Sequence, residues 1–167
     1  MAPLRIDPVA EARRHWEARW GPAPSRPMAA VTSIMRAQQV LLARLNDLVR
    51  PHGLTFPRYE ALMLLSFTRT GALPIGKLGE RLQVHRTSAS SIVAALADDG
   101  LVERVPSELD RRATLAIITD AGRAAALAAT EDLHAAGFGL DALDASEQET
   151  LTEILRALRL DAGDFIP

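Results

Sequence analysis

The chain has 167 residues, enough for one domain with extensions, and 48% of them are hydrophobic, so a buried core is available and wholesale disorder is excluded. Aromatic residues make up only 4%, which argues against an all-β protein and for a mainly helical one rich in Ala and Leu. The formal charge of -2 provides no global attraction to nucleic acid, and the absence of cysteine excludes disulfides and thiolate metal sites.

Membrane, enzyme and metal signatures are missing from the sequence. No stretch reaches the roughly 18 apolar residues of a spanning helix, and the first residues lack the apolar core of a signal peptide, so a cytoplasmic protein is expected. The four histidines are far apart, and no phosphate-binding loop or nucleophile motif occurs. We therefore expect no enzyme, no metal site and no cofactor.

The first third of the chain predicts two helices. Pro8 to Trp20 has the apolar spacing of a short amphipathic helix, and the Pro-rich run from Gly21 to Pro27 is predicted to break it. From Met28 to Arg50 the apolar positions follow a helical period for about six turns. Because this long apolar stripe needs a partner, residues 1–27 are predicted to be an N-terminal extension and linker, and residues 28–54 a dimerisation helix.

Residues 55–120 are predicted to form a separate domain. A helix with Pro57 in its first turn comes first. Gly71 to Ile75 follows, and this segment is too short and too rich in Pro and Gly for a central strand, so an edge strand or a turn is expected.

Two short helices and a hairpin complete this domain. The helices are predicted at Gly76 to Leu82 and at Arg86 to Asp98, with Gly100 just past the end of the second. Leu101 to Val105 and Arg112 to Thr119 are predicted to pair as strands around a polar turn. Two helices joined by a tight turn and followed by a hairpin are typical of a winged helix-turn-helix.

Residues 121–167 predict two more helices, which are assigned to dimerisation. The first is Ala-rich and runs from about Ala121 to Ala136. Ser146 and Glu149 are predicted to form a capping box at the start of the second. The expected fold is therefore mainly α with a small β-hairpin wing, a winged helix-turn-helix whose N- and C-terminal dimerisation helices interlock.

The second helix of the predicted helix-turn-helix divides its residues by face. Ala89, Ile92, Val93 and Leu96 have the spacing of inward-facing residues. Small hydroxyls and one arginine gather on the outer side of its first half: Arg86, Thr87, Ser88, Ser90 and Ser91. Such side chains can donate to phosphates and reach base edges, although the same residues are also common helix caps and solvated positions.

The predicted hairpin turn carries Asp110, Arg111 and Arg112. An arginine at the tip of a wing can enter the narrow minor groove, and an aspartate can orient its guanidinium. Local charge is nearly balanced, with seven basic and six acidic residues from Arg69 to Arg112. The placement of these side chains, and not their net charge, favours DNA.

Four motifs stand out between residues 52 and 122: His52-Gly53-Leu54-Thr55, Leu78-Gly79-Glu80-Arg81-Leu82, Gly100-Leu101-Val102-Glu103-Arg104 and the stretch from Asp110 to Gly122. Together they resemble the motifs of the MarR family of bacterial transcriptional regulators. The resemblance implies a homodimer that binds a pseudo-palindromic operator in double-stranded DNA. By position, it implies that the first half of the second helix faces the major groove, and that Arg112, braced by Asp110, faces the minor groove.

Two hypotheses about function follow. The first is a sequence-specific DNA-binding regulator, a repressor released by a small aromatic or anionic ligand; the alternative is a winged-helix module for dimerisation or protein interaction that does not bind DNA. A ligand crevice between the dimerisation helices and the winged domain is expected to involve Arg13, Trp16, His52, Arg58, Tyr59 and Met63. The alternative, given equal weight, is that the N-terminal helix only packs against the dimer and that Arg13 is solvated.

Overall fold

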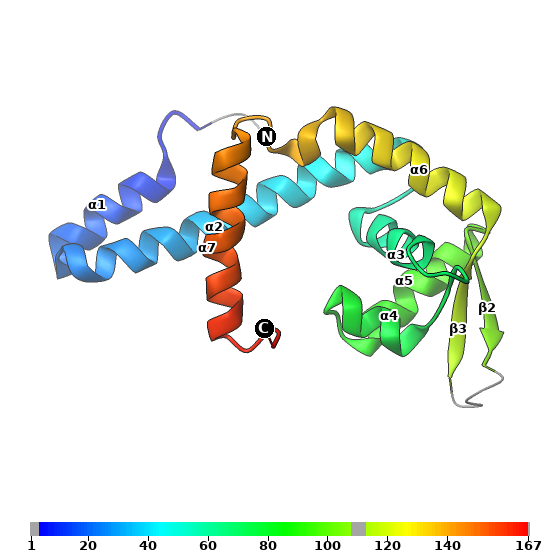
Figure 1. Ribbon diagram of the computed structural model, residues 1–167. Coiled ribbons are helices and arrows are strands. Elements are labelled where there is room, and N and C mark those ends of the chain that lie inside the picture. Colours follow the sequence, from blue (N-terminus) through cyan, green and yellow to red (C-terminus); the bar gives the residue numbers. More distant parts are fainter. Residues whose placement is uncertain (1–3, 108–112, 167) are drawn as a thin grey trace. The chain divides into compact units, whose positions relative to one another are not determined.

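The computed structural model describes residues 4–107 and 113–166 (Figure 1). The chain divides into two compact units, residues 1–44 and 45–167, and each is considered by itself. Helix α1 spans Pro8–Trp20 and helix α2 spans Pro22–Val49.

The linker predicted for Gly21 to Pro27 is wrong, because α2 already begins at Pro22. Only Gly21, with a φ of 84°, separates α1 from α2. Pro22 and Pro24 lie in the first turn, where backbone N–H groups have no partner within the helix, so proline forfeits no hydrogen bond there. Ser25 is fully buried and its Oγ donates to the carbonyl of Pro22 at 3.0 Å, which fixes this turn.

The second unit contains short helices, three strands and two longer helices. Its helices are η1 (Arg50–His52), α3 (Phe56–Ser66), α4 (Ile75–Leu82), α5 (Arg86–Asp98), α6 (Asp120–Ala135), η2 (Gly137–Gly139) and α7 (Ala145–Asp161). Its strands are β1 (Ala72–Pro74), β2 (Val102–Pro106) and β3 (Thr114–Ile118). The predicted order of elements is confirmed.

The three strands form one antiparallel sheet in the order β1-β3-β2, so β1 is an edge strand, which is one of the two alternatives predicted for this segment. Strands β2 and β3 form the predicted hairpin, with Arg104 opposite Ala116. Figure 1 shows this hairpin extending beyond the helices, and we call it the wing. The predicted wing-tip residues Asp110, Arg111 and Arg112 lie outside the described residues.

The core of the second unit lies where α3, α4, α5 and α6 meet one another and the sheet. Leu62, Leu78 and Leu96 are fully buried there. The inward face predicted for α5 is confirmed: Ala89, Val93 and Leu96 are buried and Ile92 packs against the core. Burial of this face fixes which side chains of α5 point outward.

The capping box of α7 is made by Asp144 and Glu147, so the prediction of Ser146 and Glu149 is wrong. Asp144 Oδ1 accepts from the Glu147 backbone N–H, and Glu147 Oε2 accepts from the Asp144 backbone N–H, both at 2.9 Å. Both residue pairs have the spacing of a capping box, and aspartate caps a helix as well as serine does. Within the described part of the chain, no helix is long and apolar enough to cross a membrane.

Candidate functional site

The first half of α5 carries the outer side chains that the sequence singled out. Ser90 is half-buried, and the other four are exposed: Arg86, Thr87, Ser88 and Ser91. Ser91 Oγ donates to the carbonyl of Thr87 at 3.0 Å, so its proton is used within the helix. Among the described residues, the side chains of Arg86, Ser88 and Ser90 make no hydrogen bond or ion pair, which leaves them available to a partner.

His85 caps this helix, a role that sequence reasoning missed. Its Nδ1 accepts from the backbone N–H of Thr87 at 3.3 Å and lies 2.8 Å from Thr87 Oγ1. The backbone of His85 is extended, with φ -60° and ψ 147°, as at most N-caps. Histidine is not a usual capping residue, so the only sequence signal was its place immediately before the helix.

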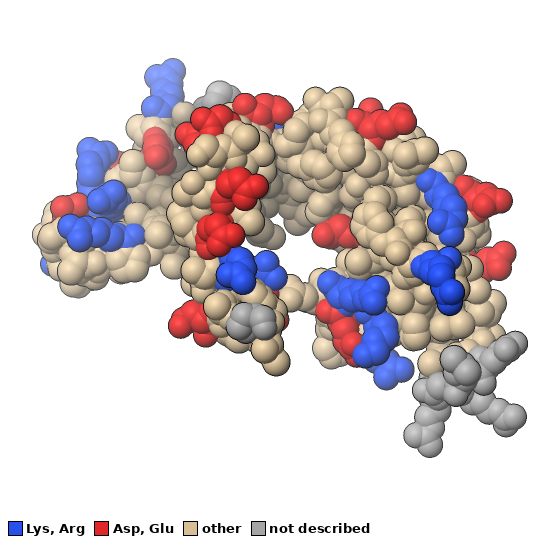
Figure 2. Space-filling model, in the orientation of Figure 1, with Lys and Arg blue, Asp and Glu red and all other residues tan. Residues whose placement is uncertain are grey.

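Among the described residues on the face that Figure 2 draws, positive charge does not form one continuous patch. Figure 2 shows Lys and Arg side chains interspersed with Asp and Glu side chains on the face that it draws. Lys77 Nζ lies 2.8 Å from Glu80 Oε2, so this lysine is neutralised locally. Arg86 and Arg104 are exposed and form no ion pair with any described residue, so both guanidinium groups can attract an anion.

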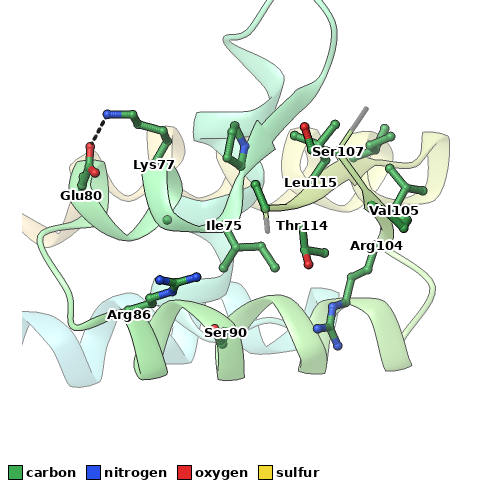
Figure 3. Close-up of a pocket in the computed structure, with 15 residues that line it drawn as sticks. Ile75, Lys77, Glu80, Arg86, Ser90, Arg104, Val105, Ser107, Thr114 and Leu115 are labelled. Carbon is green, nitrogen blue, oxygen red and sulfur yellow. Dashed lines mark hydrogen bonds and ion pairs between the residues drawn. The ribbon is translucent and has the colours of Figure 1, made fainter. Parts of the chain in front are cut away.

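A groove of about 1130 Å³ separates α5 and α4 from the wing (Figure 3). Arg86 and Ser90 border it from α5, Lys77 and Glu80 from α4, and residues of β2 and β3 from the wing. In Figure 3 Arg86 extends from the start of α5, and Arg104 extends from β2 toward the same helix. We call this the wing groove; sequence reasoning did not assign Arg104 to the site.

A smaller cavity of about 320 Å³ lies along α3, and we call it the α3 cavity. Its apolar and aromatic walls are formed by Phe56, Tyr59, Met63, Leu64, Phe67, Leu82 and Phe138. Glu60 and Arg81 are its charged residues. Partial burial raises the pKa of the Glu60 carboxyl above its usual value, although the residue as a whole is exposed.

The predicted ligand residues do not all meet in this cavity. Tyr59 and Met63 line it, and Tyr59 Oη is 3.0 Å from Thr130 Oγ1. Trp16 and Arg13 are exposed on α1, which belongs to the other unit.

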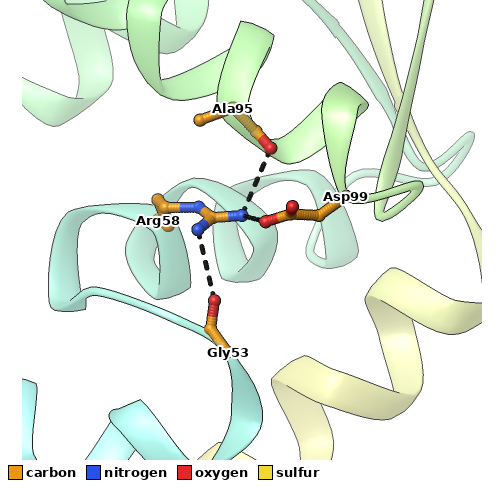
Figure 4. A network of polar contacts seen from close by, with 4 residues as sticks. All are labelled: Gly53, Arg58, Ala95 and Asp99. Carbon is orange, nitrogen blue, oxygen red and sulfur yellow. Dashed lines mark hydrogen bonds and ion pairs between the residues drawn. The ribbon is translucent and has the colours of Figure 1, made fainter.

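Arg58 and His52, the remaining predicted ligand residues, are engaged within the fold. The Arg58 guanidinium forms an ion pair with Asp99 and donates to the carbonyls of Gly53 and Ala95 (Figure 4). His52 Nε2 lies 2.7 Å from an oxygen of Asp132. The cation that borders the α3 cavity is therefore Arg81 and not Arg58.

The helix pair α4 and α5, packed on α3 and followed by the wing, defines a winged helix-turn-helix protein. A model described as MarR family matches residues 52–113. The crystal structure of Sco5413, a MarR family transcriptional regulator from Streptomyces coelicolor, is 52% identical, with a TM-score of 0.79 and coverage of 87% of this chain and 99% of that chain.

Two further relatives agree with that match. Sco3205 from Streptomyces coelicolor is a MarR family transcriptional regulator crystallised in complex with DNA. It is 25% identical, with a TM-score of 0.71 and coverage of 87% of this chain and 93% of that chain. The HTH-type transcriptional regulator MhqR of Bacillus subtilis is 29% identical over 137 residues, 79% of this chain and 90% of that protein.

The chain belongs to the MarR family, and it is a transcriptional regulator rather than an enzyme. The family predicted from the motifs at residues 52–122 is thus confirmed.

Proposed function

We propose that this protein binds double-stranded DNA as a homodimer at a pseudo-palindromic operator and represses transcription there. The observation that carries the proposal is the outer face of α5, where Arg86, Ser88 and Ser90 have no partner among the described residues. Arginine pairs with guanine edges and small hydroxyls contact bases and phosphates, which suits such a face to the major groove. Sco3205, a relative with the same fold, was crystallised with DNA.

The wing is proposed to contact the adjacent minor groove. A helix in the major groove and a hairpin beside it span one sugar–phosphate strand, and the wing groove has the placement for that strand. Asp110, Arg111 and Arg112 keep the role that the family resemblance implies for the wing tip, with Arg112 entering the minor groove and Asp110 orienting it.

A second copy of the chain is the proposed partner for the exposed apolar side chains outside the winged domain. Ile154 and Leu158 on α7 are 61% and 54% exposed, and Val31 and Met35 on α2 are 60% and 56% exposed. Exposed apolar stripes of this kind mark association surfaces. We assign residues 28–54 and 121–167 to dimerisation and residues 55–120 to DNA binding, with residues 1–27 as an extension.

Release from DNA is proposed to depend on a small aromatic or apolar anion in the α3 cavity. The cavity combines aromatic walls, including Tyr59, with one cation, Arg81. A ligand shifts the protein only by its differential affinity for two arrangements of the winged domains. A hundredfold preference corresponds to about 2.7 kcal/mol, enough to weaken an operator complex substantially.

A mobility shift across a range of salt concentrations tests the DNA proposal. The probes are the duplex upstream of the protein's own coding sequence and a duplex of the same length with shuffled sequence. We expect tighter binding to the upstream duplex and an affinity that falls steeply with salt, because phosphate contacts release counterions. Failure to bind either duplex at low salt by a folded dimer would favour the protein-interaction module instead.

Titration of benzoate and hydroxylated benzoates into the protein–DNA complex tests the ligand proposal. We expect release of the duplex, and a weaker response in Arg81→Ala because the cavity then lacks its cation. Deletion of residues 1–26 tests whether the N-terminal helix takes part: unchanged ligand sensitivity would leave it with a purely structural role.

A further inference from the structure

The wing groove contains an arginine that no predicted role accounts for. Arg104 is exposed on β2, in the middle of a strand and not at the wing tip. Val102, two residues earlier on the same face of the strand, is 3% exposed and belongs to the core. Along this one face the side chains therefore change from core to groove within two residues.

The partner strand makes the same change. Ile118 and Ala116, opposite Val102 and Arg104, are buried, whereas Thr114, opposite Pro106, borders the wing groove. Arg104 is thus the first side chain beyond the core, and Figure 3 shows it extending toward α5. No carboxylate in the described part of the chain pairs with it.

The groove also contains an internal counter-charge. Glu80 borders it and pairs with Lys77 at 2.8 Å, and both side chains are more than 60% exposed. This carboxylate lowers the positive charge of the groove by one and holds the lysine away from other anions. Among the described residues that line the groove, Arg86 and Arg104, on different elements, remain as uncompensated cations.

We propose that the wing groove holds one sugar–phosphate strand of DNA, with Arg104 as a phosphate contact made from the middle of β2 and Glu80 as a charge that limits this contact. The inference rests on the proposed DNA binding and adds a positioning residue to it. Phosphate contacts fix the register of a protein on the duplex without reading sequence, whereas α5 supplies the base contacts. Arg104 therefore acts equally on every sequence.

Arg104→Ala is the main test variant, with Arg69→Ala as a matched control. Arg69 is exposed, makes no hydrogen bond or ion pair among the described residues and does not border the groove, so its loss removes the same charge from another place. Binding is measured by fluorescence anisotropy at several salt concentrations with two duplexes, the upstream one and the shuffled one. Thermal unfolding of each variant establishes that it folds.

For Arg104→Ala we expect binding to both duplexes to be about tenfold weaker. The salt slope, meaning the slope of the logarithm of the binding constant against the logarithm of salt concentration, is expected to be shallower by about one, as for the loss of one charge-assisted phosphate contact. Arg104→Lys keeps a point charge and is expected to recover most of the slope. Arg69→Ala is expected to change affinity less than about twofold, because exposed charges at a distance are screened by salt.

Glu80→Gln provides a test of opposite sign. Removal of the carboxylate releases Lys77 toward the groove, so binding to both duplexes is expected to become tighter and the salt slope steeper. The inference is overturned if the wild-type protein binds DNA but Arg104→Ala has the same affinity for DNA as Arg69→Ala. It is also overturned if Arg104→Ala weakens binding to only one of the two duplexes. Absence of binding by the wild-type protein would instead overturn the proposed function.

Discussion

Arg58, near the start of α3, forms an ion pair with Asp99, the C-cap residue that directly follows α5 (Figure 4). The same guanidinium donates to the carbonyl of Ala95, in the last turn of α5, and to the carbonyl of Gly53. A positive charge at the carboxyl end of a helix is also favoured by the helix dipole. Arg58 thus ties the end of α5 to the segment that begins α3.

Arg58→Ala is expected to destabilise the fold by about 1–3 kcal/mol. The Arg58 side chain is only 16% exposed, and its loss removes one donor from the Asp99 carboxylate and from the carbonyls of Gly53 and Ala95. Arg50→Ala is the matched control, because Arg50 pairs with Asp47 on the surface, at 72% and 65% exposure. That change is expected to cost no more than about 1 kcal/mol. Urea unfolding measures both, and equal costs would contradict the structural role of Arg58.

Gly122→Ala is expected to cost about 1–3 kcal/mol or more, as for an overpacked core position. A Cβ at Gly122 would lie 2.1 Å from the carbonyl oxygen of Leu101, and a backbone atom cannot yield as a flexible side chain can. Gly76→Ala is the control, because the space around Gly76 in α4 is open. It is expected to be neutral or stabilising by up to about 1 kcal/mol. If the two variants unfold at the same urea concentration, the result would contradict the close packing of Gly122 in α6 against the Leu101 carbonyl.

Glu60→Gln is expected to stabilise the fold at neutral pH. The raised pKa means that the folded state favours the protonated carboxyl, so ionisation costs stability once the pH exceeds the ordinary carboxyl pKa of about 4.3. Glutamine has no charge to desolvate and avoids this cost. The difference between variant and wild type is expected to vanish as the pH falls through the carboxyl range. Thermal unfolding from neutral to acidic pH checks this. A stability difference between variant and wild type that grows as the pH falls would contradict the prediction.

Ile154→Glu combined with Leu158→Glu is expected to convert the dimer to monomer or to unfold it. Both side chains are more than half exposed on α7, and a charge in an apolar interface is costly. Glu153→Gln, on an exposed position of the same helix, is expected to remain dimeric. Analytical ultracentrifugation separates the outcomes. A wild-type protein that sediments as a folded monomer at micromolar concentration would refute the proposed homodimer.

The order of helices and strands could be predicted because it rests on local signals. Apolar spacing located α5, and Gly100, at φ 72°, follows its end as expected. Where several residues satisfied one rule, the sequence could not choose between them, as with Asp144 and Ser146 at the start of α7. Prolines were also ambiguous: Pro22 and Pro24 suggested a break but occupy the first turn of α2.

Among the described residues, the sequence pointed to the candidate site only on α5. Arg86, Ser88 and Ser90 follow from the helical period once the inner face of α5 is known. The roles of Arg58 and Arg104 depend on pairings between distant segments: Asp99 lies 41 residues beyond Arg58, and Arg104 borders the groove only because β2 pairs with β3 beside α5. No local pattern encodes such contacts.

Selection of duplexes from a random-sequence pool, followed by sequencing of the bound fraction, tests the central claim most directly. A homodimer that places one α5 in each of two successive major grooves predicts an enriched inverted repeat, with half-sites about 10 base pairs apart between their centres. Substitution of Arg86 or Ser88 should change the enriched bases within each half-site. A pool that shows no enriched sequence, or a single unrepeated half-site, would contradict the account.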